Sequence, residues 1–198
     1  MNDKMIKDII LWASNLNVSY IIKFHEFVEA HLSTKGEEVS EKIENHGVRD
    51  EAFVNLQIEK DLYLEHYKRH LIINTFLMLY SHFEEWLYLI WKKIGKNTSL
   101  EKSRGSITRF KTFLKNDLNV DLSRNKDWIF IIEAETIRNC LLHANGRVDL
   151  VRNKIEMERI LNKHRNYLKT KNKRLSPNKE FLEKFFGSIQ RTITKIKD

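Results

Sequence analysis

Apolar residues recur at intervals of three and four along most of the chain, as they do in amphipathic α-helices. The first such series predicts one or two helices over residues 3–32, with an irregularity at 15–17. Residues 33–50 are polar and contain two glycines, so we expect a connection with a short helix there. The members of the first series are Ile6, Ile9, Ile10, Ala13, Leu16, Tyr20, Phe24, Phe27 and Leu32.

A longer helical run follows over residues 51–94. Its second half, from Leu71 onward, is apolar on nearly every side, so other helices or a second subunit should surround it. We expect this segment to be the central helix of the fold. Ser106 is then the expected N-terminal cap of a short helix whose Ile107 and Phe110 face inward.

Three more helical segments are expected in the C-terminal part of the chain. One spans residues 127–144 and ends at the dipeptide Asn145-Gly146, because such residues commonly end helices. A basic helical stretch covers about residues 151–170. After a polar break around Pro177, a closing amphipathic helix runs towards the C-terminus.

The composition supports an all-α fold class. The 198 residues include one proline and six glycines, too few for the many turns of an all-β fold. A chain of this length fits a single domain. We divide it into a helical segment, residues 1–49, packed on a helical domain, residues 50–198, with both parts in one compact unit.

Positive charge is concentrated towards the C-terminal end. The formal net charge is +8, yet residues 1–146 carry a net −1 and residues 147–198 a net +9. This asymmetry favours a polyanionic partner such as RNA, because lysine and arginine on phosphates release condensed counterions. A solvated basic surface is the alternative.

Cysteine content and hydropathy limit the cellular setting. A single cysteine, Cys140, excludes a disulfide framework and a cysteine-rich zinc site. The N-terminus lacks the apolar core of a signal peptide. The most apolar stretch, residues 71–94, is interrupted by polar residues and is too polar to span a bilayer. We therefore expect a cytoplasmic protein with no membrane partner.

The helix expected over residues 127–146 carries the candidate chemistry. At about 100° per residue, one side holds Phe130, Ile137, Leu141 and Ala144 and should face the core. The other side combines polar with apolar residues, namely Glu135, Arg138, Asn139 and His143 with Trp128, Ile131 and Leu142. Because a two-fold axis places one patch against itself, this second face predicts a homodimer through the helix.

The stretch from Arg138 to His143, RNCLLH, resembles the ribonuclease motif of the HEPN superfamily. In that motif an arginine, often followed by asparagine, precedes a histidine by four to six residues. The preceding isoleucine, the closing Asn145-Gly146 and the central segment 73–87 are also similar to the family. The resemblance covers residues 50–198 and implies a HEPN-like helical bundle with a long central helix.

The resemblance also implies an activity, metal-independent endoribonuclease cleavage by the neighbouring 2′-hydroxyl. Catalytic roles would fall to Arg138, Asn139 and His143, contributed by both subunits of the homodimer. Histidine exchanges protons near neutral pH, arginine can bind two phosphate oxygens, and Asn139 can orient the imidazole or bind the phosphate. Family members of this kind are toxins or phage-defence effectors, so an antitoxin or regulatory protein is a possible partner. Some small toxin members carry a tyrosine two residues after the histidine, where this chain has Asn145.

The basic C-terminal part would then dock RNA. The RNA-binding residues that we expect are Arg147, Arg152, Lys154, Lys163, Arg165 and Lys169. A second arginine–histidine pair with the same spacing, Arg159 and His164, lies in a charged segment and is interpreted as chance or as part of the basic surface.

Two other classes of function stay open beside the ribonuclease. One is a non-catalytic HEPN module that binds RNA or nucleotide or mediates assembly, and the other is a helical scaffold with a nucleic-acid-binding tail. His66 and His70 are spaced to meet one metal ion, but nothing in the correct register completes the ligand set. We therefore expect no metal and no cofactor.

Overall fold

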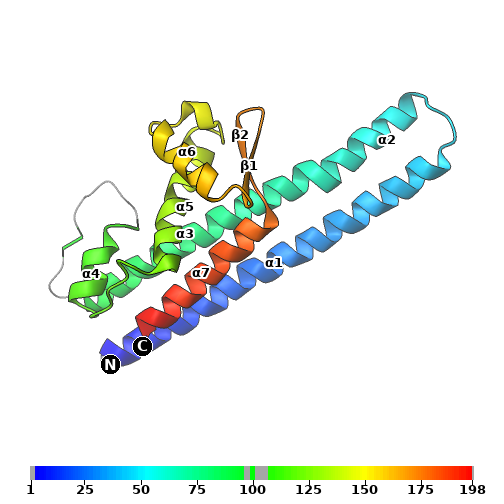
Figure 1. Cartoon of the computed structure of the whole chain (residues 1–198). Coiled ribbons are helices and arrows are strands. Elements are labelled where there is room, and N and C mark those ends of the chain that lie inside the picture. Colours follow the sequence, from blue (N-terminus) through cyan, green and yellow to red (C-terminus); the bar gives the residue numbers. More distant parts are fainter. Residues whose placement is uncertain (1–2, 96–98, 101–106, 198) are drawn as a thin grey trace.

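A long helical hairpin forms one layer of the fold. In the computed structural model, which describes residues 3–95, 99–100 and 107–197, α1 (Asp3–Asn45) runs antiparallel to a second continuous helical run (Figure 1). That run consists of α2 (Glu51–Asp61), the π-helical segment η1 (Leu62–Tyr67) and α3 (Lys68–Ile94). With 43 residues, α1 is about 65 Å long. The expected boundary at 49–50 falls in the turn between α1 and α2.

The remaining elements pack on one half of this hairpin. They are α4 (Phe110–Asn116), α5 (Lys126–His143), the 3-10 turn η2 (Val148–Leu150), α6 (Lys154–Lys163), strands β1 (Leu168–Lys171) and β2 (Arg174–Pro177), and α7 (Lys179–Lys197). Helix α7 lies alongside α1 and α3, and α5 crosses α3 and packs against α7 (Figure 1). The expected all-α class is confirmed, with one small β-hairpin as the exception.

Aromatic rings from α3, α5 and α7 form the centre of the core. Phe76 of α3 meets Phe185 of α7 edge-to-face, with 4.9 Å between ring centroids, and Phe181 at 5.2 Å. Phe130 of α5 lies 5.7 Å from Phe181. Each such pair contributes about 0.5–1.5 kcal/mol beyond the area it buries. Helix α5 is therefore fixed to α3 through α7.

The N-terminal part differs from the expectation in two ways. Residues 33–45, expected to be a connection, continue α1 as one helix. In addition, four of the nine residues in the apolar series that predicts this helix face solvent, namely Ile9, Tyr20, Phe24 and Phe27. The buried side consists mainly of residues outside the series, Leu11, Val18 and Val39 with Ser14 and His25, and Leu32 is the one buried member of the series. Helix α1 thus has two apolar faces, which a single periodic pattern does not separate.

The basic stretch expected to be helical over 151–170 is shorter and is followed by strands. Helix α6 ends at Lys163, and residues 168–171 pair with 174–177 as an antiparallel hairpin. Its two-residue turn, Asn172-Lys173, has φ of +51° and +60°, the backbone that closes tight hairpins. Leu168 and Leu175 are buried and attach the hairpin to the core. The lysines around these two leucines made the two strands hard to recognise in the sequence.

The expected cap Ser106 and most of the polar loop before it lie outside the described residues. The short helix that follows is α4, which begins at Phe110. Ile107 and Phe110 are buried, as predicted, and Phe113 is buried as well. Within the described ranges, none of the helices combines the length and apolar character needed to cross a membrane.

Candidate active site

Helix α5 is held at both ends by polar contacts. Asn125 caps its N-terminus, where the side chain accepts a hydrogen bond from the Trp128 N–H at 2.9 Å. Asp127 in the first turn accepts hydrogen bonds from Arg191 at 2.8 Å and from Ser188 at 3.1 Å, both on α7. The Arg191 guanidinium lowers the pKa of Asp127 below its usual value. Helix α5 therefore begins at a fixed position against α7.

The predicted division of α5 into a core face and an outer face is partly wrong. Trp128 and Ile131, expected on the outer face, are fully buried. The cause is that α3 and α7 both pack on α5, so its buried arc is wider than one side. Of the apolar residues assigned to that face, Leu142 alone is exposed, at 47%.

The chain after α5 is connected to the hairpin. Asn145 and Gly146 have φ of +50° and +74°, a left-handed conformation that ends the helix as predicted. The Gly146 carbonyl accepts from the Leu175 N–H at 2.8 Å, and the Asn145 carbonyl accepts from Arg174 at the same distance. The segment then returns through η2 along the exposed side of α5.

This return creates a groove of about 610 Å³ between α5 and the start of α6. Arg138, Asn139 and His143 line it from α5, and Arg152 lines it from the returning segment. The structure therefore brings the three candidate catalytic residues together with one of the expected RNA-binding residues. The other lining residues are Glu135, Thr136, Cys140, Ala144, Leu150, Val151 and Asn153.

The Arg138 guanidinium is held on two sides. Its Nη1 donates a hydrogen bond to Asn139 Oδ1 at 3.0 Å, and its Cζ lies 5.5 Å from the ring centroid of Tyr80, which is fully buried in α3. A cation above an aromatic ring is attracted to the ring's negative face. Arginine has five N–H donors, and in the described structure Arg138 uses one of them, while its buried Nε has no hydrogen-bond partner. Several donors therefore stay available to an anion in the groove.

Asn139 has a different geometry from the one expected. Its amide oxygen accepts from Arg138, so within one chain it orients the arginine. His143 is the last residue of α5, one turn after Asn139, and its side chain is exposed. No residue of the described structure forms a hydrogen bond or ion pair with His143, so both ring nitrogens are open to a ligand or to another chain.

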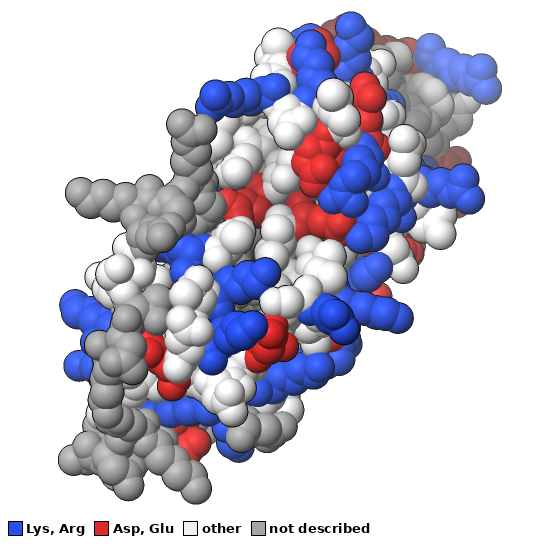
Figure 2. Space-filling model, turned by 60° about the vertical axis from the view of Figure 1, so that its left-hand side comes forward, with Lys and Arg blue, Asp and Glu red and all other residues white. Residues whose placement is uncertain are grey.

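The expected RNA-binding residues do not form one surface. Two of them have acidic partners: Arg147 binds Asp149 through two hydrogen bonds of 2.7 and 2.8 Å, and Lys163 binds Glu133. The Arg147 guanidinium lowers the pKa of Asp149 to about 2. Figure 2 shows that acidic side chains are interspersed with basic ones on this side of the molecule. Arg152 lines the groove, and Lys154 follows it in an adjoining hollow. Arg165 and Lys169 are exposed elsewhere.

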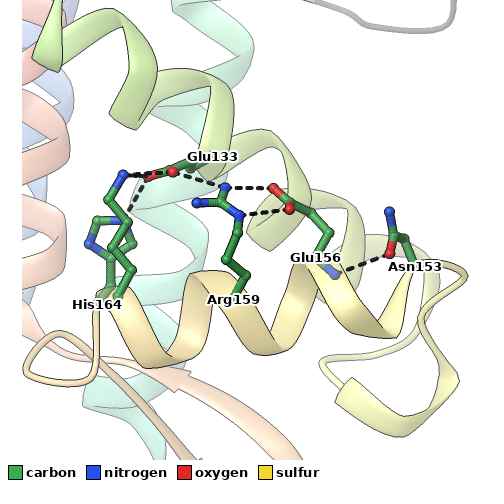
Figure 3. Close-up of polar contacts among 6 residues, drawn as sticks. Glu133, Asn153, Glu156, Arg159 and His164 are labelled. Atoms are coloured by element: carbon green, nitrogen blue, oxygen red, sulfur yellow. Dashed lines mark hydrogen bonds and ion pairs between the residues drawn. The ribbon is translucent and has the colours of Figure 1, made fainter.

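The second arginine–histidine pair belongs to a buried ion cluster (Figure 3). Glu133 of α5 is 5% exposed and accepts hydrogen bonds from Arg159 at 3.0 Å, Lys163 at 2.7 Å and His164 at 2.8 Å. Burial alone would raise the pKa of Glu133, but these three donors outweigh it and lower the pKa. Burial lowers the pKa of His164, and Glu133 opposes that effect only in part. The pair thus joins α5 to α6, with His164 buried and Arg159 half-exposed, so His164 is not part of the expected basic surface.

Sequence reasoning missed Glu133 and Tyr80 as supports of the site. Glu133 stands on the buried arc of α5, and an acidic residue within an apolar run was the available signal. Tyr80 looked like any other core residue of the central helix. Among the described residues, no group of three or more histidine, cysteine or acidic side chains is placed to hold a metal ion.

Comparison with family models, curated proteins and solved structures finds no match.

Proposed function

We propose that this chain is a metal-independent endoribonuclease of HEPN type. The observation that carries the proposal is the convergence of Arg138, Asn139 and His143, the three residues of the motif, on one groove with Arg152. A groove that holds two guanidinium groups and an imidazole suits a phosphodiester, because its negative oxygens match the guanidinium donors.

The proposed reaction is an attack of the ribose 2′-hydroxyl on the adjacent phosphorus. The 2′-oxygen–phosphorus bond forms, the phosphorus–5′-oxygen bond breaks, and the products are a 2′,3′-cyclic phosphate and a 5′-hydroxyl. One proton leaves the 2′-hydroxyl and one is delivered to the 5′-oxygen, and His143 is the group suited to both transfers. Arg138, held by Asn139 and Tyr80, donates to the non-bridging oxygens as their charge grows.

A homodimer through the 127–146 helix would supply a second His143, so that one imidazole acts as base and the other as acid. Exposed apolar residues around the groove support such a contact: Leu142 is 47%, Leu150 64% and Ile155 83% exposed. The same reasoning gives the biological setting that we propose, a cytoplasmic toxin or phage-defence effector with an antitoxin or regulatory partner.

The test uses purified protein, total RNA and a chelator. Arg138→Ala and His143→Ala should each lower the cleavage rate by about 10²–10⁴-fold, because each removes a group that acts in the transition state. His66→Ala, at an exposed histidine of η1, is the matched control and should cut like the wild type. Mapped products should end in a cyclic phosphate.

Two results would contradict the proposal. The site is wrong if both variants cut at the wild-type rate, and the mechanism is wrong if activity disappears with the chelator. A wild-type chain that binds RNA in the groove without cutting it would instead identify a non-catalytic HEPN-like binding module.

A further inference from the structure

An exposed apolar face runs along the N-terminal half of α1. Trp12 is 68% and Phe27 73% exposed, Tyr20 and Phe24 are each 57% exposed, and Leu16 is half-buried between them. Met5 and Ile9, at 54% and 47%, continue the face towards the N-terminus. These residues are not isolated, because successive members are three or four positions apart and so lie on one side of the helix.

This face lies on the opposite side of α1 from the core. At 100° per residue, its mean direction is about 180° from that of the buried Leu11, Val18 and Leu32. A surface helix of a monomer normally carries polar residues there. Between residues 5 and 27, the exposed charged residues on or beside the face are Asp8, Lys23 and Glu26.

The arrangement of the face is close to two-fold symmetric about Leu16. Trp12 and Tyr20 are four positions before and after it, and Met5 and Phe27 are eleven positions before and after it. Asp8 is eight positions before Leu16 and Lys23 is seven positions after it, and both lie on the same edge of the face. Neither charge forms an ion pair with another described residue.

We propose that this face binds the same face of a second copy of the chain, with the two α1 helices antiparallel and the two-fold axis at Leu16. In that arrangement Trp12 lies against the partner's Tyr20, and Met5 lies against the partner's Phe27. Asp8 lies beside the partner's Lys23, twice by symmetry, as an isologous interface requires. A parallel arrangement would instead place Asp8 beside Asp8.

The exposed area is sufficient for such a contact. Four aromatic side chains of about 200 Å² each, exposed by 57–73%, leave on the order of 500 Å² uncovered on one protomer. With Met5, Ile9 and the stems of neighbouring residues, two protomers exceed the roughly 1,000 Å² of a specific interface. A membrane surface is the less suitable occupant, because interfacial helices are rich in lysine and arginine beside their apolar face, and between residues 5 and 27 Lys23 is the one exposed basic residue.

Cysteine cross-linking tests the antiparallel register directly. In a Cys140→Ala background, a mixture of Trp12→Cys and Tyr20→Cys chains should form a disulfide-linked dimer under mild oxidation. Neither variant should do so alone, because position 12 and its symmetry mate are offset by about 12 Å along the helices, beyond the reach of a disulfide. A disulfide-linked dimer of either variant alone would overturn the register, and no cross-link in any sample would overturn the interface.

Molar mass by light scattering provides a second readout. Trp12→Glu should halve the mass of the wild-type assembly, and Val54→Glu, at an exposed apolar residue of α2, should leave it unchanged. Halving is expected whether or not the α5 contact also forms. If both contacts form, the wild type is a tetramer, and the Trp12→Glu chain, which keeps only the α5 contact, is a dimer. Circular dichroism checks that each variant is folded. An unchanged mass for Trp12→Glu, or wild-type binding to neutral or anionic lipid vesicles through this face in place of self-association, would contradict the proposal.

Discussion

His164 Nε2 lies 2.8 Å from Glu133 Oε2, and both side chains are buried between α5 and α6. Helix α6 begins directly after Arg152 and Asn153, so this joint also fixes one wall of the groove. Glu133→Ala should lower the free energy of unfolding by about 2 kcal/mol, because it leaves buried hydrogen-bond donors without an acceptor. The value stays moderate since Arg159 and Lys163 are half-exposed and can turn to solvent. Urea denaturation measures it.

Glu156→Ala is the matched control for that change. Glu156 also binds Arg159, at 2.7 Å, but it is more exposed than Glu133 and lies on α6 alone. Its loss should cost less than about 1 kcal/mol. Equal effects of the two substitutions would show that the cluster is a surface network without a role in joining the helices.

Stability should fall on mild acidification because of two buried histidines. Burial lowers the pKa of both His25 and His164 below the ordinary value of 6.5. As the pH falls through 6.5, the unfolded chain takes up protons that the folded chain does not, so the free energy of unfolding decreases until the folded pKa values are passed. Denaturation curves at pH 7.5, 6.5 and 5.5 should show this decline, and a His25→Gln/His164→Gln chain should show a flatter one.

RNA docking should depend on the charges beside the groove. Arg152→Gln with Lys154→Gln should weaken RNA binding and reduce the slope of log affinity against log salt by about 0.7 for each phosphate that the protein no longer neutralises. Arg165→Gln with Lys169→Gln removes the same charge at sites away from the groove and should have a smaller effect. Filter binding at several salt concentrations separates the two pairs. Equal slopes would indicate that RNA is held by net charge.

Gly36, nine residues before the end of α1, allows close contact with η1. A Cβ added there would overlap the Leu64 side chain. Gly36→Ala should therefore destabilise the hairpin by about 1 kcal/mol, the overpacking cost less the gain in helix propensity. Adding Leu64→Ala should cost less in this background than in the wild type, which a double-mutant cycle measures. Additive effects would mean that Leu64 moves aside freely.

The helix that carries the motif was predictable because its signals are local. An apolar run of helical period and the Asn145-Gly146 stop predicted residues 127–144, and the structure has Lys126–His143. The groove was less predictable, since its second wall returns from η2 by hydrogen bonds to the hairpin. Charge alone predicted both Arg152 and Lys163 as RNA-binding residues. Only the three-dimensional packing shows that Lys163 forms an ion pair with Glu133. The sequence also did not show which apolar face of α1 is exposed, because periodicity identifies an apolar face but not what covers it.

The π-helical segment η1 has a consequence for how the protein can vary. An extra residue in an α-helix rotates everything that follows by about 100°, which would turn the buried face of α3 away from α1. In a π-helical segment such as Leu62–Tyr67, hydrogen bonds reach five residues back, so one additional residue is absorbed within a wide turn. The wide turn of η1 can therefore absorb one residue, and we expect that removing one residue there leaves both halves of the hairpin with their packing partners.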